Sequence, residues 1–142
     1  MKVTTTIGMA IEAKNTLETW MTHEFPAKQA RDVSRVLNRL KSNVDIMATD
    51  DVRVKLVFKY GTRNDNGMTS VSQASMVDFV REYSPLAEEP IELEVPGLPE
   101  DILDYAPATK PLAIAALEPF WAIQQQKENK HDDAVSSNSP QV

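Results

Sequence analysis

The chain has 142 residues, 15 Lys and Arg against 21 Asp and Glu, a net charge of −6 and no cysteine. This length suits one domain, and the lack of cysteine excludes disulfides, thiolate nucleophiles, iron–sulfur clusters and zinc fingers. No apolar run reaches the roughly 18 residues of a membrane span, and the N-terminus lacks the apolar stretch of a signal peptide, so we expect no membrane contact.

The first predicted helix covers residues 5–25. Apolar side chains recur at helical spacing from Ile7 to Trp20, while Lys14 and Glu18 are expected on the opposite, solvent-facing side.

The second predicted helix is the most regular feature of the sequence and runs from Pro26 to about Tyr60. It would form an antiparallel hairpin with the first helix, and Gly61 would end it in the left-handed conformation. A narrow apolar seam on one side predicts contact with another helix. The seam consists of Ala30, Val33, Leu37, Leu40, Val44, Met47, Val54 and Phe58. Asp51 interrupts the seam, either where it leaves its partner helix or as a polar residue that sets the register.

Residues 51–60 also fit a strand, because apolar and charged residues nearly alternate there. A hairpin turning at Asn66-Gly67 would then follow. We favour a helix because Val54 and Phe58 keep the spacing of the seam.

The second part of the chain predicts shorter elements. A third helix begins after Ser72 and is kinked at Pro85, a short strand covers residues 91–95, and a last helix covers residues 111–123. The fold class is therefore mainly α with minor strand content, in one domain over residues 1–123. The polar residues 124–142 have too few apolar side chains to fold and are predicted to be a disordered tail.

No pattern in the sequence indicates catalysis. The two histidines lie far apart in the sequence, and there is neither a G-x-S-x-G nucleophile elbow nor a phosphate-binding glycine loop. We therefore predict a protein that is not an enzyme, with no catalytic residue, metal or cofactor.

The charge is uneven along the chain. Residues 1–63 carry 11 Lys and Arg against 7 Asp and Glu, and residues 64–142 carry 4 against 14, so the two parts are +4 and −10. The acidic part holds a candidate partner-binding surface that includes Glu88, Glu89, Glu92, Glu94, Glu100, Asp101 and Asp104. Such a surface could imitate the charge of a nucleic acid.

Four cations form a candidate anion-binding face on the second helix, because their spacing of three and four places them together: Lys28, Arg31, Arg35 and Arg39. The simpler interpretation is a solvated outer face, and a third is that the acidic part of the chain packs near it. The acidic total argues against binding of nucleic acid by the whole molecule but leaves this face open. Phe120 and Trp121 are either core residues or, if exposed, a hydrophobic anchor for a partner.

Four segments together resemble a family of small uncharacterised proteins of tailed bacteriophages, over about residues 26–118. They are Val57-Phe58-Lys59-Tyr60-Gly61, Asp65-Asn66-Gly67, Phe79-Val80-Arg81-Glu82 and Ile91-Glu92-Leu93. The resemblance implies a phage product in the bacterial host cytoplasm or the virion, acting through contacts with viral or host proteins. It implies no catalytic residues.

The predicted function is therefore a protein-interaction module, either a virion or assembly accessory protein or an inhibitor of a host protein that binds through the acidic surface. The first alternative is a nucleic-acid-binding protein that uses the basic face. A further one is a homo-oligomer assembled through the apolar seam.

Overall fold

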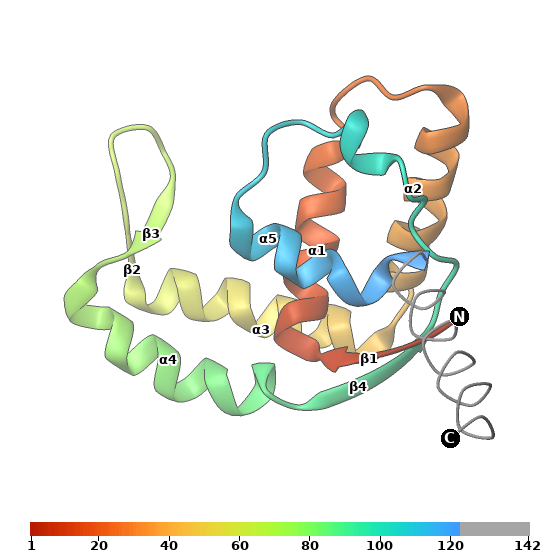
Figure 1. Ribbon diagram of the computed structural model, residues 1–142. Coiled ribbons are helices and arrows are strands. Elements are labelled where there is room, and N and C mark those ends of the chain that lie inside the picture. Colours follow the sequence, from red (N-terminus) through yellow and green to blue (C-terminus); the bar gives the residue numbers. More distant parts are fainter. Residues whose placement is uncertain (123–142) are drawn as a thin grey trace, which may run out of the picture.

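The computed structural model describes residues 1–122, and they are mainly helical (Figure 1). The predicted tail, residues 124–142, lies outside the described residues. The α-helices are α1 (Ile7–Trp20), α2 (Ala27–Lys41), α3 (Val44–Tyr60), α4 (Gln73–Ala87) and α5 (Pro111–Leu117), with short 3₁₀ turns η1 (Ile102–Asp104) and η2 (Glu118–Phe120). The strands are β1 (Lys2–Thr6), β2 (Gly61–Arg63), β3 (Thr69–Val71) and β4 (Pro90–Glu94). No helix among these residues combines the length and the apolar character needed to cross a membrane.

The chain begins with a strand that the sequence analysis did not predict. β1 pairs antiparallel with β4, with Lys2 opposite Glu94 and Thr6 opposite Pro90. The consecutive threonines of β1 favour extended backbone, because β-branched side chains suit strands. Thr6 then caps α1 by accepting a hydrogen bond from the backbone N–H of Met9 at 3.2 Å. The first helix therefore begins at Ile7 rather than at residue 5.

The predicted continuous helix from Pro26 to Tyr60 is wrong, because the chain breaks at Ser42 and Asn43 into α2 and α3. Asn43 is extended (φ −80°, ψ 122°), and its side chain accepts a hydrogen bond from the N–H of Ile46 at 3.0 Å. Asparagine is among the preferred N-cap residues, so this side chain starts a new helix. The helical interpretation of residues 51–60 is confirmed.

The apolar seam divides at the same break. Val33, Leu37 and Leu40 of α2 are buried, but Val44 is 80% exposed and Phe58 is 68% exposed. The seam is therefore not one contact surface: its first half belongs to the core and its second half faces outward.

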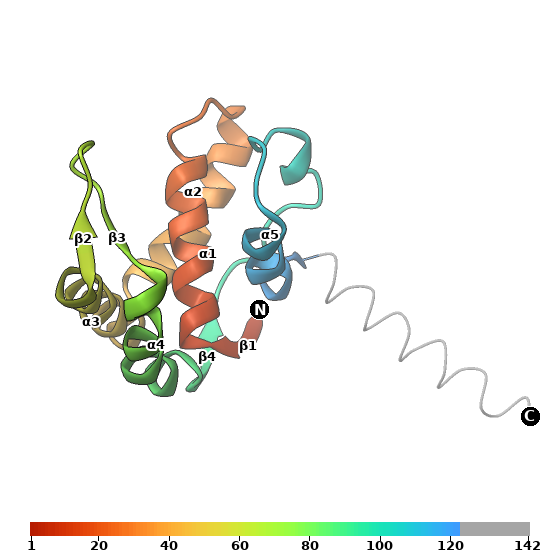
Figure 2. The same ribbon diagram turned by 90° about the vertical axis from the view of Figure 1, so that its left-hand side faces the viewer.

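The core surrounds α1, which lies between α2 and α5 and above α3 and α4 (Figures 1 and 2). Its largest fully buried side chains include Trp20, Phe120, Ile11, Leu17, Leu40 and Ile46. The indole Nε1 of Trp20 donates a hydrogen bond to Oγ1 of Thr109 at 2.9 Å, which fixes the segment before α5 to the end of α1.

Phe120 is completely buried and Trp121 is only 8% exposed, so the two are core residues and not an exposed hydrophobic anchor. The backbone holds them in place: the N–H of Leu98 donates to the carbonyl of Phe120 at 2.8 Å.

α4 extends to Ala87 with Pro85 inside it. Proline removes one backbone donor, and so close to the end of a helix this costs a single intrahelical hydrogen bond.

Residues 52–87, which we call the arm, contain the end of α3, the β2–β3 hairpin and α4. Figures 1 and 2 show α3 and α4 side by side and the hairpin extending away from the helices around α1. Leu56, which is 7% exposed, is the only buried residue of the arm, and α4 has none. The arm is therefore formed of regular elements that have little core of their own.

Candidate interaction surfaces

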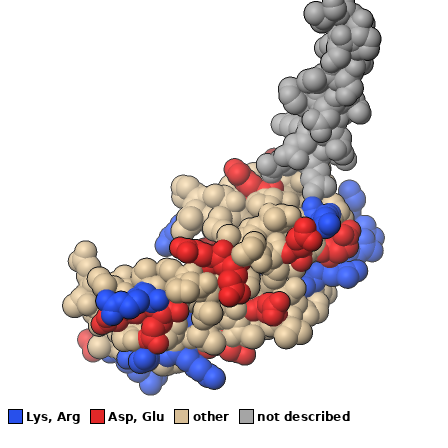
Figure 3. Space-filling view, turned by 90° about the horizontal axis from the view of Figure 1, so that it is seen from below, with Lys and Arg blue, Asp and Glu red and all other residues tan. Residues whose placement is uncertain are grey.

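The acidic residues singled out from the sequence do not form one free surface. Glu92 and Glu94 point outward from β4, but Glu92 lies 3.7 Å from the Lys2 ammonium and Glu94 lies 3.2 Å from the N-terminal amine. Asp101 accepts a hydrogen bond from the Gln29 side chain at 3.0 Å. Figure 3 shows acidic side chains in separate groups on this face, with basic ones beside them.

The remaining acidic candidates are more open. Glu88 and Glu89 connect α4 to β4 and are exposed, as are Glu100 and Asp104. No ion pair joins these four to a cation within residues 1–122. Glu88 and Glu89 directly follow the arm in the sequence, so two negative charges lie next to its C-terminal end.

The basic face exists as a surface of α2. Lys28, Arg31, Arg35 and Arg39 are all exposed, opposite the buried residues of the same helix. Among the described residues, the only ion pair that involves any of them is Arg31 with the adjacent Asp32, at 3.7 Å. The acidic part of the chain does contact the same helix, through Asp101 and Gln29, but none of its described residues forms an ion pair with the four cations.

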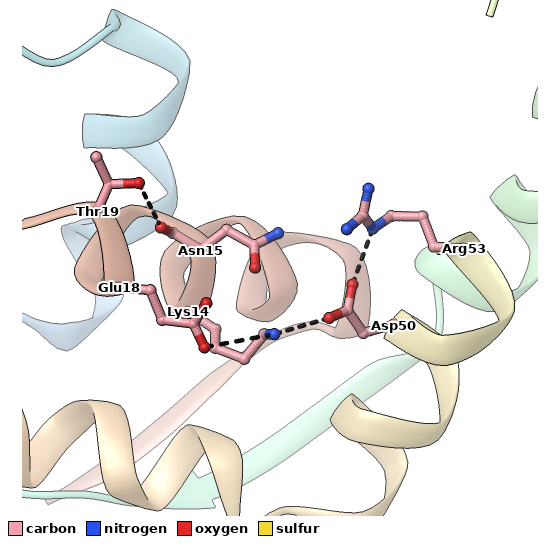
Figure 4. Close-up of polar contacts among 6 residues, drawn as sticks. All are labelled: Lys14, Asn15, Glu18, Thr19, Asp50 and Arg53. Carbon is pink, nitrogen blue, oxygen red and sulfur yellow. Dashed lines mark hydrogen bonds and ion pairs between the residues drawn. The ribbon is translucent and has the colours of Figure 1, made fainter. Parts of the chain in front are cut away.

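A buried ion cluster joins α1 to α3, and sequence reasoning missed it (Figure 4). The Lys14 ammonium lies 2.7 Å from Oδ2 of Asp50, and Nε of Arg53 donates to Oδ1 of the same carboxylate at 2.9 Å. Lys14 was predicted to face solvent with Glu18, but it is only 4% exposed and Asp50 only 8%. Glu18 lies 3.8 Å from the Lys14 ammonium.

The electrostatics of this cluster favour a charged Asp50. Burial alone would raise the pKa of Asp50, but its hydrogen bonds to Lys14 and Arg53 and their positive charges together hold the pKa below its ordinary value. The sequence feature that could have indicated this cluster is the pair Asp50-Asp51. The apolar spacing singles out Asp51, as the polar interruption of the seam, and not Asp50. Asp51 is exposed, and Asp50 makes the contacts.

The cluster is a structural link between helices. Its charged groups are engaged with one another, Lys14 with Asp50 and Glu18, and Arg53 with Asp50. Within residues 1–122, no group of three or more His, Cys, Asp and Glu side chains is placed to hold a metal ion.

An open groove of about 490 Å³ lies between the end of α3 and the β2–β3 hairpin, and sequence reasoning missed it as well. Its lining is Arg53, Val54, Val57, Phe58, Arg63, Gly67, Met68 and Thr69. Phe58 is 68% exposed and Met68 is 67% exposed, so both project into solvent at its edge.

Two glycines shape this groove. Gly61 does not adopt the predicted left-handed conformation: it is extended (φ −90°, ψ 161°), and a Cβ there would lie 2.3 Å from the carbonyl oxygen of Val57. Glycine is needed because α3 passes directly into β2. Gly67 has φ +80°, the left-handed conformation that glycine adopts at no steric cost. Across the same turn, Oδ1 of Asn64 accepts hydrogen bonds from the backbone N–H groups of Asn66 and Met68.

Exposed polar contacts hold α4 against α3. The Lys59 ammonium lies 3.0 Å from the Glu82 carboxylate, and the Tyr60 hydroxyl donates to the same carboxylate. The hydrogen bond from Tyr60 is the main reason why the pKa of Glu82 is lowered, with Lys59 adding to it. At the far end of α4, the close approach of Gly8 and Ala87 leaves no room for a Cβ on Gly8, which would lie 2.8 Å from that of Ala87.

Comparison with known proteins gives no match to a family model, a curated protein or a solved structure. The resemblance to phage proteins stays a prediction from the residues that carry it.

Proposed function

We propose that this protein is a non-enzymatic interaction module whose arm binds another protein. The observation that supports this most directly is the distribution of exposed apolar side chains. Of twelve large hydrophobic residues exposed in the described part of the chain, seven belong to the arm: Val52, Val54, Phe58, Met68, Met76, Val77 and Val80.

The energetics favour a partner on this surface. Covering one large apolar side chain contributes roughly 1.5–3 kcal/mol, and three of the seven, Val54, Phe58 and Met68, line the same groove, where a partner could cover them together. A partner that covers Phe58 and Met68 would also bury part of the hairpin, whose residues line the same groove.

The acidic segment is a second surface that the same partner would contact. Glu88 and Glu89 continue the arm at the C-terminal end of α4, so one partner could contact both surfaces. Charge reversal at Glu92, Glu94 and Asp101 tests the original form of the idea, in which the acidic surface alone holds the partner. Undiminished binding would rule that form out.

The biological setting follows from the resemblance to phage proteins. In this proposal the protein is made in the host cytoplasm and is either a virion or assembly accessory protein or an inhibitor of a host protein. Mass spectrometry of purified particles distinguishes the two settings, since an accessory protein of the virion is present there.

Site-specific photo-crosslinking tests the role of the arm. A photoreactive amino acid replaces Phe58 or Met68, and Val44 serves as the control because it is as exposed but lies outside the arm. We expect the two arm positions to give the same crosslinked protein in the producing cell, and Val44 to give none. Equal crosslinking at all three positions would contradict the proposal.

The basic face of α2 supports a second candidate function, nucleic-acid binding, because its four cations are exposed and, among residues 1–122, only Arg31 has an ion-pair partner. This candidate predicts a gel shift that weakens steeply with salt and disappears when Arg31, Arg35 and Arg39 become alanine. No shift at low salt would eliminate it.

A further inference from the structure

The groove between α3 and the hairpin combines an apolar lining with positive charge. The chain carries a net charge of −6, yet the groove is lined by Arg53 and Arg63 and by no carboxylate. A positively lined apolar groove favours a partner of opposite charge, because complementary charge steers association and like charge disfavours it.

Both guanidinium groups retain free donors. Arg53 uses Nε to bond Asp50, and Arg63 has no ion pair among residues 1–122. A Cβ on Gly67 would lie 3.5 Å from Nη2 of Arg63, so this guanidinium lies beside the turn, next to Met68. Arginine binds carboxylates and phosphates through pairs of parallel hydrogen bonds, and carboxylate is the one of these two groups that an unmodified polypeptide carries.

The size of the groove limits the occupant. The hairpin strands have three residues each, which is about 10 Å of extended chain, and Val54 and Phe58 are one helical turn apart on α3. Two or three apolar side chains from a partner fill a site of this length. A folded surface without a protruding segment would reach only its edge.

We infer that the groove takes a short segment of a partner protein that places two or three apolar side chains on Val54, Phe58 and Met68 and carboxylates next to Arg53 and Arg63. The inference rests on the proposed function and specifies the chemistry of the partner. A nucleic acid suits this lining less well, since Val54, Val57 and Met68 are aliphatic and only Phe58 offers a ring on which a base could stack.

A library of short random peptides displayed on yeast provides the probe. We expect wild-type protein to enrich acidic peptides with two or three large apolar residues, and the double variant Phe58→Ser, Met68→Ser to lose them. Both side chains are exposed, and a circular dichroism spectrum like that of the wild type checks that the variant is folded.

Charge reversal then tests the role of the arginines. Arg63→Glu should lower affinity for the acidic peptides by about tenfold and shift enrichment toward basic ones. Lys41→Glu is the matched control, because Lys41 is also exposed and unpaired within the described residues but lies on α2; it should change neither.

Several results would overturn the inference. They are neutral or basic peptides enriched by the wild type, enrichment that survives the double serine variant, equal effects of the two charge reversals, or a homodimer that depends on Phe58. Crosslinking from Phe58 and Met68 to one protein would still support the proposed function in each of these cases except the homodimer, so the two failures are distinguishable.

Discussion

At the scale of single residues, the carboxylate of Asp50 joins two helices. It holds Lys14 of α1 and Arg53 of α3 in a largely buried cluster. Removing one member of such a cluster leaves an uncompensated charge away from water, whereas replacing it entirely by apolar groups is often nearly neutral.

We predict that Asp50→Asn lowers the free energy of unfolding by about 3 kcal/mol. The pKa of Asp50 is lowered in the folded state, so its contribution is present at neutral pH and is lost as the pH falls through the acid range. The variant should therefore also lose part of its acid sensitivity. Urea unfolding at neutral and acid pH measures both effects.

Asp51→Asn is the matched control because Asp51 is the exposed neighbour on the same helix. It should change stability by less than about 0.5 kcal/mol. Equal effects of the two variants would contradict the role assigned to the cluster. The double variant Lys14→Met, Asp50→Leu should recover most of the lost stability.

Gly61 is the second residue with a clear test. Its Cβ would meet backbone at 2.3 Å and Thr69 Cγ2 at 2.7 Å, so Gly61→Ala should displace the hairpin and cost on the order of 1–3 kcal/mol. Gly67→Asn should be mild, because asparagine tolerates a positive φ. Thermal unfolding compares the two, and a harmless Gly61→Ala would show that the hairpin is placed differently.

At the scale of elements, the break between α2 and α3 decides the shape of the molecule. The helical spacing of apolar residues continues through Ser42 and Asn43, so this spacing alone predicts one continuous helix. Asn43 nevertheless caps a new helix there. A helix of this apolar pattern and a pair of capped helices share the same periodicity. Only the local hydrogen bond that the backbone N–H of Ile46 donates to Oδ1 of Asn43 distinguishes them.

We predict that Asn43→Ala destabilises the protein by about 1 kcal/mol, the usual cost of losing an N-cap. Asn38→Ala is the control, since Asn38 is an exposed interior position of α2 where alanine is a better helix former. Chemical denaturation measures both, and an Asn43→Ala variant as stable as wild type would contradict the capping role.

The sequence correctly predicts a helix after Ser72, the strand β4 and the helical state of residues 51–60, because their patterns agree with their local surroundings. Ile91 and Leu93 alternate with outward Glu92 and Glu94, as a half-buried strand requires. The sequence does not predict β1, because its partner β4 is far away along the chain. It also does not predict the burial of Lys14, because the partner Asp50 lies on another helix. Long-range pairing of this kind leaves no periodic signal.

The candidate site is less predictable for the same reason. The basic face follows from spacing within one helix, so sequence alone places it correctly on α2. The groove depends on the angle at Gly61 between α3 and the hairpin, which no local pattern encodes. Phe58 belongs to a regular apolar repeat, and only the fold shows that it is left uncovered.

At the scale of the whole molecule, the proposed binding function of the arm depends on one contrast. The region around α1 is well buried, whereas the arm buries only Leu56. Elements with little buried apolar surface open at a lower free energy than the core. This contrast is a property of the protein alone and can be measured without a partner.

Residue-resolved amide hydrogen exchange of the purified protein tests this most directly. We predict that the amides of α4 and of the β2–β3 hairpin exchange at least about 100-fold faster than those in the middle of α1, a difference of roughly 2.7 kcal/mol in opening free energy. Equal protection of α1 and α4 would show that the arm is fully stabilised within the monomer, and would contradict the claim that it is a surface completed by a partner.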